Sequence, residues 1–531
     1  YLNVEDLGWE PFTTSWLATK EDTVMVEVLQ KLIAKFVQPV LEFKRRECKE
    51  PVPIDQLSAV RCLCTMFDAM ATAENGVSPS NGEAYPLMIE LTFLFSLIWT
   101  IGATVDEAGR AKIDALLREM DARFPSSETV YEYYVDPKKK GWAPFEEKLP
   151  QSYKPPADTP FFKMMVPTVD TVRSKFIASK FLSVYKHTLI VGNVGVGKTM
   201  VAQSVLEGLP ETKNSMAINF SAQTSSNSLQ ETIEGKLEKR TKGVFTPAGG
   251  KKMVVFVDDM NMPKKSTFGF MPPLELLKLW IDNGFWYDRI KCELKHIKEL
   301  QLLTAMAPPG GGRSAFSQRI SACFAVLNMT APDDIQLTRI FGTLLTNKLS
   351  DFDDEIKPLG EPLTTACIAI YRAVTETLLP TPSKSHYVFN TRDLAKVIQG
   401  VMQATKQFYD SKESMLQLFV HESSRIYMDR MWDPADKKWL QSQLDELLGS
   451  QFSTSWGAIF EDGNCPPFVS FLRNVENPPY EPVQDISKLK AFLVEKLEDY
   501  ALEPGHSAMD LVLFRDALFH ICKIHRVLMQ P

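Results

Sequence analysis

One octapeptide has the residue types and the spacing of a phosphate-binding loop. A glycine-rich turn ends in Lys-Thr, in the order Gly192, Asn193, Val194, Gly195, Val196, Gly197, Lys198 and Thr199, with Met200 next. Glycines let successive backbone N–H groups face an anion, while the lysine reaches the β and γ phosphates and the threonine hydroxyl binds Mg²⁺. The motif therefore predicts a nucleotide site over Gly192–Met200, with Lys198 also assisting catalysis.

Two aspartates supply the acidic side chains that such a site needs. Asp258 ends an apolar run 59 residues after Thr199, and Asp259 follows it. A carboxylate at the end of a buried strand beside a phosphate loop can hold Mg²⁺, so Thr199 and Asp258 are the expected metal ligands. Asp259 stands where an ATPase has a base that orients the attacking water, and we expect it to be catalytic. A GTP site is disfavoured, because the nearest match to the guanine motif Asn-Lys-x-Asp, at 347–350, lacks the aspartate.

Five short apolar runs place these residues on one sheet. They alternate with helical patterns and are 188–191, 216–220, 253–257, 301–306 and 324–328. Buried strands separated by crossovers predict a parallel five-stranded sheet with helices on both faces, which is an α/β fold. The phosphate loop follows the first run directly and opens a helical pattern, which is the context that its motif requires.

Helical patterns flank the α/β region on both sides. Apolar spacing predicts helices over 24–36, 56–71 and 111–120 before it, and over 364–377, 391–409, 414–431 and 438–447 after it. Residues 131–150 have the composition of an ordered linker, and a proline-rich break at 464–482 precedes a last helical piece from 485. The uncharged run 91–105 has 15 residues. Because crossing a membrane takes about 20, we expect a buried helix and no membrane segment.

The composition limits the function further. Basic residues number 59 and acidic residues 66, a net charge of −7 that argues against a nucleic-acid-binding protein. Eight cysteines among 531 residues are too few for a disulfide scaffold, and reduced thiols fit an intracellular compartment. The first six residues lack an initiator methionine and have strand-like character, so we expect a piece excised from a longer protein.

Several longer motifs resemble the third AAA+ module of axonemal dynein heavy chains. They are VDDMNMP at 257–263, APPGGGR at 307–313, LPTPSKSHYVFNTRDL at 379–394, VPTVDTVR at 166–173 and LGWEPF at 7–12. The resemblance covers essentially the whole chain, and an inner-arm heavy chain fits better than an outer-arm one. It implies a P-loop AAA+ large domain flanked by α-helical lids. In order, these are the small lid of the second module plus linker (1–150), the large domain of the third module (151–340), its lid (341–484) and the start of the fourth module (485–531).

The resemblance also assigns roles to further residues. Val166 and Pro167 match positions beside the adenine, and Arg392 matches the lid arginine that touches the γ-phosphate and assists catalysis. Arg319 resembles the arginine finger that serves the preceding module. Three residues depart from the family pattern: Asp259 replaces the usual glutamate, Ala307 a sensor asparagine, and Ala322 a second arginine. Since a finger is worth about 10³–10⁵ in rate and this site's own finger would come from the fourth module, we expect tight nucleotide binding and slow hydrolysis.

The implied function is a nucleotide-binding regulatory section of an axonemal dynein, a minus-end-directed microtubule motor that drives ciliary and flagellar beating. The expected cofactors are ATP or ADP with Mg²⁺. Expected partners are the neighbouring AAA+ modules and, through other regions, intermediate chains, light chains and axonemal microtubules; neither nucleic acid nor a membrane is expected. The implied location is the axoneme, on the cytoplasmic, reducing side. Two alternatives stay open: a purely structural ring segment with permanently bound nucleotide, and a non-motor AAA+ remodelling ATPase, which would normally carry an aromatic pore-loop signature.

Overall fold

The chain forms two compact units in the computed structural model. The first unit combines residues 1–152 with 167–332, and the second combines residues 153–166 with 333–531. The structure describes residues 7–150, 153–155, 159–315, 317–460, 463–473, 475, 478–502, 507, 509 and 511–529. The expected strand-like start at residues 1–6 lies outside these ranges.

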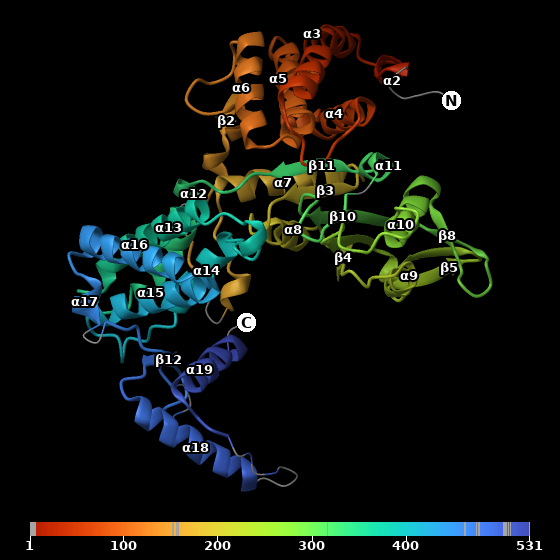
Figure 1. Ribbon diagram of the computed structural model, residues 1–531. Coiled ribbons are helices and arrows are strands. Elements are labelled where there is room, and N and C mark those ends of the chain that lie inside the picture. The colour runs from red at the N-terminus through yellow and green to blue at the C-terminus, as the bar shows by residue number, and fades with distance from the viewer. Residues whose placement is uncertain are drawn as a thin grey trace. The chain divides into compact units, whose positions relative to one another are not determined.

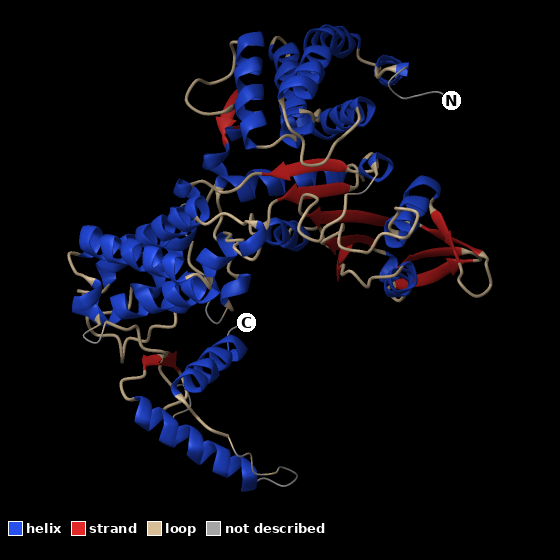
Figure 2. Cartoon of the chain, viewed as in Figure 1, coloured by secondary structure: helices blue, strands red, loops and turns tan. Residues whose placement is uncertain are grey.

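A parallel five-stranded sheet forms the centre of the first unit (Figures 1 and 2). Its order is β11-β3-β10-β7-β4, and every neighbouring pair is parallel. The strands are β3 (Thr188–Gly192), β4 (Lys213–Asn219), β7 (Lys252–Asp258), β10 (Leu300–Met306) and β11 (Ala325–Met329). This confirms the predicted sheet. Because β3 and β7 both pair with β10, the loops that follow them lie on either side of β10 at the carboxyl edge, where α/β sheets bind ligands.

Helices cover both faces of this sheet. Alternate side chains of β3 point to opposite layers: Leu189 and Val191 join one apolar cluster, and Ile190 joins the other. The first cluster includes side chains of α9 (Ser226–Glu234) and α10 (Pro272–Asn283). The second includes side chains of α7 (Val169–Ser183) and α8 (Lys198–Glu207). A short helix, α11 (Gln318–Ser321), precedes β11.

A second, four-stranded sheet in the first unit was not expected from the sequence. Its order is β5-β6-β9-β8, with β5 (Leu237–Thr241), β6 (Val244–Pro247), β8 (Phe285–Tyr287) and β9 (Leu294–Ile297). Strand β5 reads Leu-Glu-Lys-Arg-Thr and is exposed over its last four residues. This strand lacks the apolar run or the strict alternation that reveals a strand in a sequence.

The N-terminal helices pack against the edge of the large sheet in the same unit. They are α2 (Glu10–Ala18), α3 (Thr23–Glu47), α4 (Gln56–Met70), α5 (Ala84–Thr100) and α6 (Glu107–Met120). Asn328 of β11 accepts a hydrogen bond from Arg110 at its carbonyl, and its Nδ2 donates to the Val105 carbonyl at 2.8 Å. The expected linker at 131–150 contains a hairpin of β1 (Tyr133–Asp136) and β2 (Gly141–Pro144).

One helix among the described residues is long and apolar enough to pass a membrane-span test. It consists of α5 and the short 3-10 turn that follows, Ala84–Thr104 together, and 89% of its most apolar stretch is buried inside the protein. Burial on all sides explains why the helix can be apolar all round.

The second unit is mostly helical. It contains α12 (Asp334–Leu349), α13 (Gly360–Thr377), α14 (Thr391–Val401), α15 (Lys412–Tyr427), α16 (Pro434–Phe452), α17 (Trp456–Ile459), β12 (Phe468–Val469), β13 (Glu481–Pro482), α18 (Ile486–Leu502) and α19 (Arg515–Met529). The prediction of one helix over 391–409 is wrong, because α14 ends at Val401. Past that point the amides of Gln403 and Ala404 bond three residues back, and the Tyr409 hydroxyl is held by the Tyr480 carbonyl.

Candidate nucleotide site

The predicted phosphate loop is a tight turn between β3 and α8. Gly192 ends the strand, and Gly197 caps the helix in the left-handed region, at φ 88°. Gly195 has φ 89°, a conformation that residues with a Cβ rarely adopt. At Gly192 a Cβ would lie 2.8 Å from the carbonyl oxygen of Met329 in β11, so this position has no room for a side chain. The glycines are therefore required by the backbone, and the loop opens a helix N-terminus, which favours an anion.

Lys198 is folded back over its own loop. Its Nζ donates to the carbonyl oxygens of Gly192 at 2.9 Å and Asn193 at 2.8 Å, and the residue is buried. Asn193 is exposed, whereas Val194, Val196 and Met200 are partly buried. The ammonium group therefore lies against the turn that would surround a phosphate.

The two expected metal ligands are in direct contact. Thr199 Oγ1 donates to Asp258 Oδ2 at 2.7 Å, and the other carboxylate oxygen of Asp258 accepts from the backbone N–H of Asp259 at 2.9 Å. The contact is possible because β3, whose following loop leads to Thr199 in α8, and β7, which ends at Asp258, both pair with β10. A hydroxyl and a carboxylate are oxygen ligands of the kind Mg²⁺ takes, so the donor set fits that ion.

Asp259 is held differently from Asp258. Its backbone lies in the left-handed region at φ 51°, which is unusual for a residue with a side chain. Its Oδ1 lies 3.6 Å from Nη2 of Arg313, in the loop after β10. Ala307, at the sensor position, is buried and offers only its carbonyl, which accepts from Asn261 Nδ2 at 2.8 Å.

The remaining predicted residues lie outside this loop, two of them in the second unit. Val166 is buried in the apolar core of the second unit, and Pro167 is partly buried at the start of the first unit's second segment. Arg392 is exposed on the first turn of α14, in the second unit, and its backbone N–H donates to Asn390 Oδ1 at 2.9 Å. Arg319 is exposed on α11, and Ala322 follows that helix. The adenine, lid and finger roles therefore stay predictions.

Sequence reasoning assigned no role to two residues beside Asp259, namely Arg313 and Asn261. Asn261 is fully buried, and its carbonyl accepts from the Ser314 backbone at 3.1 Å. Three consecutive glycines before Arg313 indicated a turn, and all three have positive φ. The sequence does not show where this turn places the side chain of Arg313.

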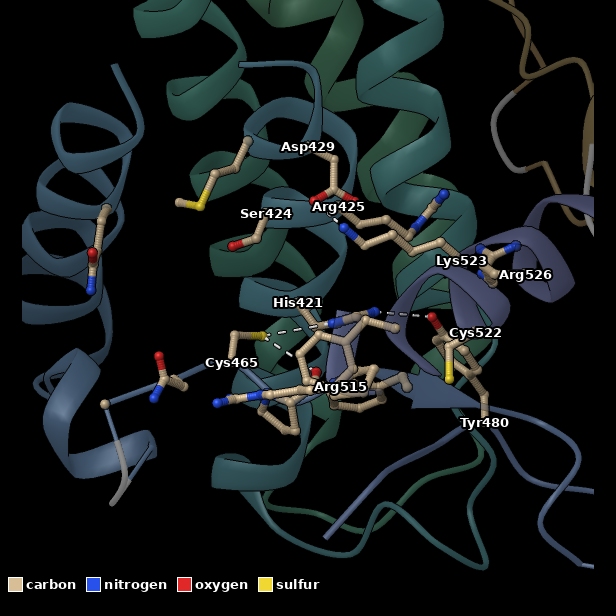
Figure 3. A pocket seen from close by; sticks show the side chains of 18 of the residues that line it. His421, Ser424, Arg425, Asp429, Cys465, Tyr480, Arg515, Cys522, Lys523 and Arg526 are labelled. Atoms are coloured by element: carbon tan, nitrogen blue, oxygen red, sulfur yellow. Dashed lines mark hydrogen bonds and ion pairs between the residues drawn. The ribbon is translucent and has the colours of Figure 1, made fainter. Parts of the chain in front are cut away.

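A separate cavity lies within the second unit (Figure 3). It has a volume of about 290 Å³ and is lined by side chains of α15 and α19, including His421, Arg425 and Arg526. Glu422, next to the lining residue His421 in the sequence, is fully buried; it accepts from the Tyr480 hydroxyl at 2.7 Å and from Arg425 Nη2 at 2.8 Å. Burial by itself would raise the pKa of Glu422, but Arg425 and the other nearby cations outweigh it and lower that pKa. The carboxylate therefore stays charged and ties α15 to Tyr480, just before β13, and to Arg526 of α19.

Known proteins resemble this chain over its whole length. A family model described as "P-loop containing dynein motor region" matches residues 153–332, and "Dynein heavy chain AAA lid domain" matches residues 29–147. An "AAA+ lid domain" model matches residues 363–453. The "Dynein-1-beta heavy chain, flagellar inner arm I1 complex" of Chlamydomonas reinhardtii is 62% identical over the whole chain.

The chain belongs to the dynein heavy chain family. "Dynein axonemal heavy chain 2" of Mus musculus and of Homo sapiens are each 47% identical to it, again over the whole chain. The expected AAA+ fold with helical lids and the expected likeness to axonemal dyneins are confirmed, and the Chlamydomonas relative is an inner-arm protein. The chain spans 13% of that relative and 12% of the two mammalian dyneins.

Proposed function

We propose that this chain is a nucleotide-binding, regulatory AAA+ section of an axonemal dynein motor. The contact that carries the proposal is the 2.7 Å hydrogen bond between Thr199 and Asp258, formed where a phosphate loop and an acidic strand end flank one central strand. In this proposal residues 1–150 are the lid of the second module plus linker, 151–340 the large domain of the third, 341–484 its lid, and 485–531 the start of the fourth.

The proposed ligand is ATP or ADP with Mg²⁺. Backbone N–H groups of Gly192–Met200 and the Lys198 ammonium would bind the phosphates, and Thr199 with Asp258 would hold the metal. Bound Mg²⁺ would neutralise phosphate charge during transfer. Asp259 would orient water, Arg392 would approach the γ-phosphate, and Val166 with Pro167 would flank the adenine. Arg319 would serve the nucleotide of the preceding module.

Hydrolysis at this site should be slow. Asp259 is one methylene shorter than the usual glutamate and already faces a cation 3.6 Å away. Ala307 has no polar side chain with which to help orient water. An arginine finger for this site would come from another module, and such a residue is worth about 10³–10⁵ in rate. A nucleotide that is bound tightly and hydrolysed slowly can act as a regulatory ligand, because its binding favours one position of the lid domain over another.

The wider role follows from the relatives and is likewise proposed. Their names describe axonemal and flagellar inner-arm dynein heavy chains. We infer that the whole protein is a minus-end-directed microtubule motor of the ciliary or flagellar axoneme. Neighbouring AAA+ modules would contact this section directly, whereas intermediate chains, light chains and microtubules would bind elsewhere. Neither nucleic acid nor a membrane is a proposed partner.

Nucleotide binding can be tested with a lysine pair. Lys198→Ala removes the charge that faces the loop. We expect the affinity of the chain for Mg·ATP to fall about 10- to 100-fold, because one or two charge-assisted hydrogen bonds to the phosphates would be lost. Lys239→Ala, at an exposed position of β5, is the matched control and should bind like the parent. Titration of a fluorescent ATP analogue measures both, and equal affinity in the two variants would remove the site assignment.

A structural segment with permanently bound nucleotide is the second candidate. It is favoured by the pairing of Asp259 with Arg313 and by the alanine at the sensor position. Exchange of bound nucleotide distinguishes the two functions. Release within minutes would support a regulatory site, and retention over hours against excess unlabelled ATP would support the structural role.

A further inference from the structure

The loops after β7 and β10 are tied together beside Asp259. The Met260 N–H donates to the Ala305 carbonyl at 3.1 Å, and Asn261 Nδ2 donates to the Ala307 carbonyl at 2.8 Å. The Ser314 N–H donates back to the Asn261 carbonyl at 3.1 Å. These bonds run in both directions between the two loops, so a residue in the second loop keeps a fixed distance from Asp259.

Arg313 is that residue, and its turn is narrow. The Gly310 N–H donates to the Arg313 carbonyl and the Arg313 N–H to the Gly310 carbonyl, both at 3.0 Å. Gly310, Gly311 and Gly312 have φ of 130°, 55° and 86°, conformations that together suit glycine alone. The loop therefore closes on itself and presents the arginine side chain at one place.

The Arg313 side chain has one ion-pair partner among the described residues, which is Asp259. The side chain is 23% exposed, and its buried Nε has no hydrogen-bond partner in the described part of the chain. A largely buried guanidinium with an unused donor depends on a nearby negative charge. Asp259, 43% exposed, supplies that charge and is itself held at φ 51°.

A carboxylate that assists hydrolysis has to face water. Hydrolysis joins a water oxygen to the γ-phosphorus, breaks the bond to the β–γ bridging oxygen and leaves ADP and phosphate, while the water's proton passes to a base. Asp259 Oδ1 lies 3.6 Å from the Arg313 guanidinium, so this oxygen is directed at the cation and is not placed to hold the attacking water.

We propose that Arg313 is a positioning residue that restrains Asp259, so that hydrolysis requires this ion pair to open. The inference rests on the proposed nucleotide site and adds a control element carried by the glycine turn. The left-handed backbone of Asp259 and the Arg313 Nε, which has no hydrogen-bond partner among the described residues, place the restraint at this pair.

The test compares four variants of the 531-residue chain in single-turnover hydrolysis of γ-labelled ATP. Arg313→Gln should raise the rate constant roughly two- to fivefold, the factor expected for losing a partly exposed pair, with ATP affinity within twofold of the parent. Arg313→Lys keeps the charge and should restore the parental rate. When Arg313→Gln is added to Asp259→Asn, the rate constant of hydrolysis should not rise, because the carboxylate that Arg313 restrains is absent.

An Arg313→Gln rate equal to or below that of the parent, or the same gain in the Asp259→Asn background, would overturn the restraint. If Arg313→Gln does not fold, Gly311→Ala, which strains the turn but keeps the arginine, should show a smaller gain of the same sign, and no gain would count against the proposal. Absence of ATP binding by the parent would instead contradict the proposed function.

Discussion

At the scale of single residues, the site depends on two oxygens brought within 2.7 Å. Thr199 and Asp258 are 59 positions apart, and each ends or follows a strand that pairs with β10. Their types and order were predictable, because the phosphate-loop motif and an acidic strand end have recognisable spacing. Their contact follows once the strand order is known.

Thr199→Val should separate metal binding from phosphate binding. Valine keeps the shape but removes the hydroxyl, so the gain in ATP affinity that Mg²⁺ provides should fall about tenfold, while affinity without Mg²⁺ stays within twofold. Thr199→Ser keeps the hydroxyl and serves as the control. Calorimetric titration with and without Mg²⁺ measures the difference. An unchanged Mg²⁺ effect in the valine variant would mean that Thr199 does not hold the metal.

The positions of other residues of the site could not be predicted from the sequence, for a physical reason. Arg313 was visible inside a glycine-rich motif, but its position beside Asp259 is set by hydrogen bonds between two loops about 50 residues apart in sequence. Asp259 was predicted as a base, and its left-handed backbone could not be read from its residue type. Pairings between loops depend on tertiary structure that local patterns do not encode.

At the scale of elements, the strands of the large sheet were predictable and those of the small sheet were not. Strands such as β7 are continuous apolar runs, whereas β5 is mostly charged and is recognised only by its pairing with β6. The end of α14 was also missed. Residues 402–409 keep an apolar spacing, yet they turn so that Tyr409 reaches the Tyr480 carbonyl. Tertiary contacts override helical pattern at such ends.

His187 links β3 to β10 and should make the first unit sensitive to acid. Its Nδ1 accepts from the Leu302 N–H at 3.1 Å, and its ring packs near Trp280 and Phe324. Burial, with a smaller effect of Lys186, lowers the pKa of His187 from 6.5 to about 4. The unfolded chain therefore binds more protons between these values, so stability is present above pH 6.5 and is lost as the pH falls toward 4.

The variant His187→Gln tests this effect. Glutamine can still accept the Leu302 hydrogen bond but does not titrate, so the loss of stability between pH 6.5 and 4.5, at most about 3 kcal/mol from this group, should shrink. Urea unfolding at several pH values measures it. His421 in the second unit also has a pKa lowered to about 4 by burial, so part of the acid sensitivity should remain. Identical pH slopes in variant and parent would contradict the assignment.

At the scale of the whole molecule, the first unit joins the N-terminal helices to the nucleotide-binding sheet. Arg110 of α6 is buried, its guanidinium lies 5.0 Å from the ring centroid of Tyr131, and it donates to the Asn328 carbonyl of β11. Burial lowers the pKa of Arg110 to about 10, so the group remains charged near neutral pH. We infer that strain in the N-terminal helices can reach the edge strand of the large sheet through this contact.

Arg110→Met should loosen that connection. It leaves the Asn328 carbonyl without its donor, and we expect the first unit to lose about 2 kcal/mol of unfolding free energy. Arg46→Met, at a position whose side chain is 69% exposed, should change the stability by less than about 0.5 kcal/mol. Thermal unfolding followed by circular dichroism gives both values. Equal melting temperatures in the two variants would show that the contact does not hold the helices to the sheet.

The central claim is that the turn from Gly192 to Thr199 surrounds the phosphates of an adenine nucleotide. An electron cryomicroscopy map or crystal structure of the chain with Mg·ADP tests it most directly. We predict density for the diphosphate within the turn, a metal between Thr199 and Asp258, and Lys198 Nζ released from the carbonyls of Gly192 and Asn193. A turn that is empty at saturating Mg·ADP, with Lys198 still bonded to those carbonyls, would contradict the account.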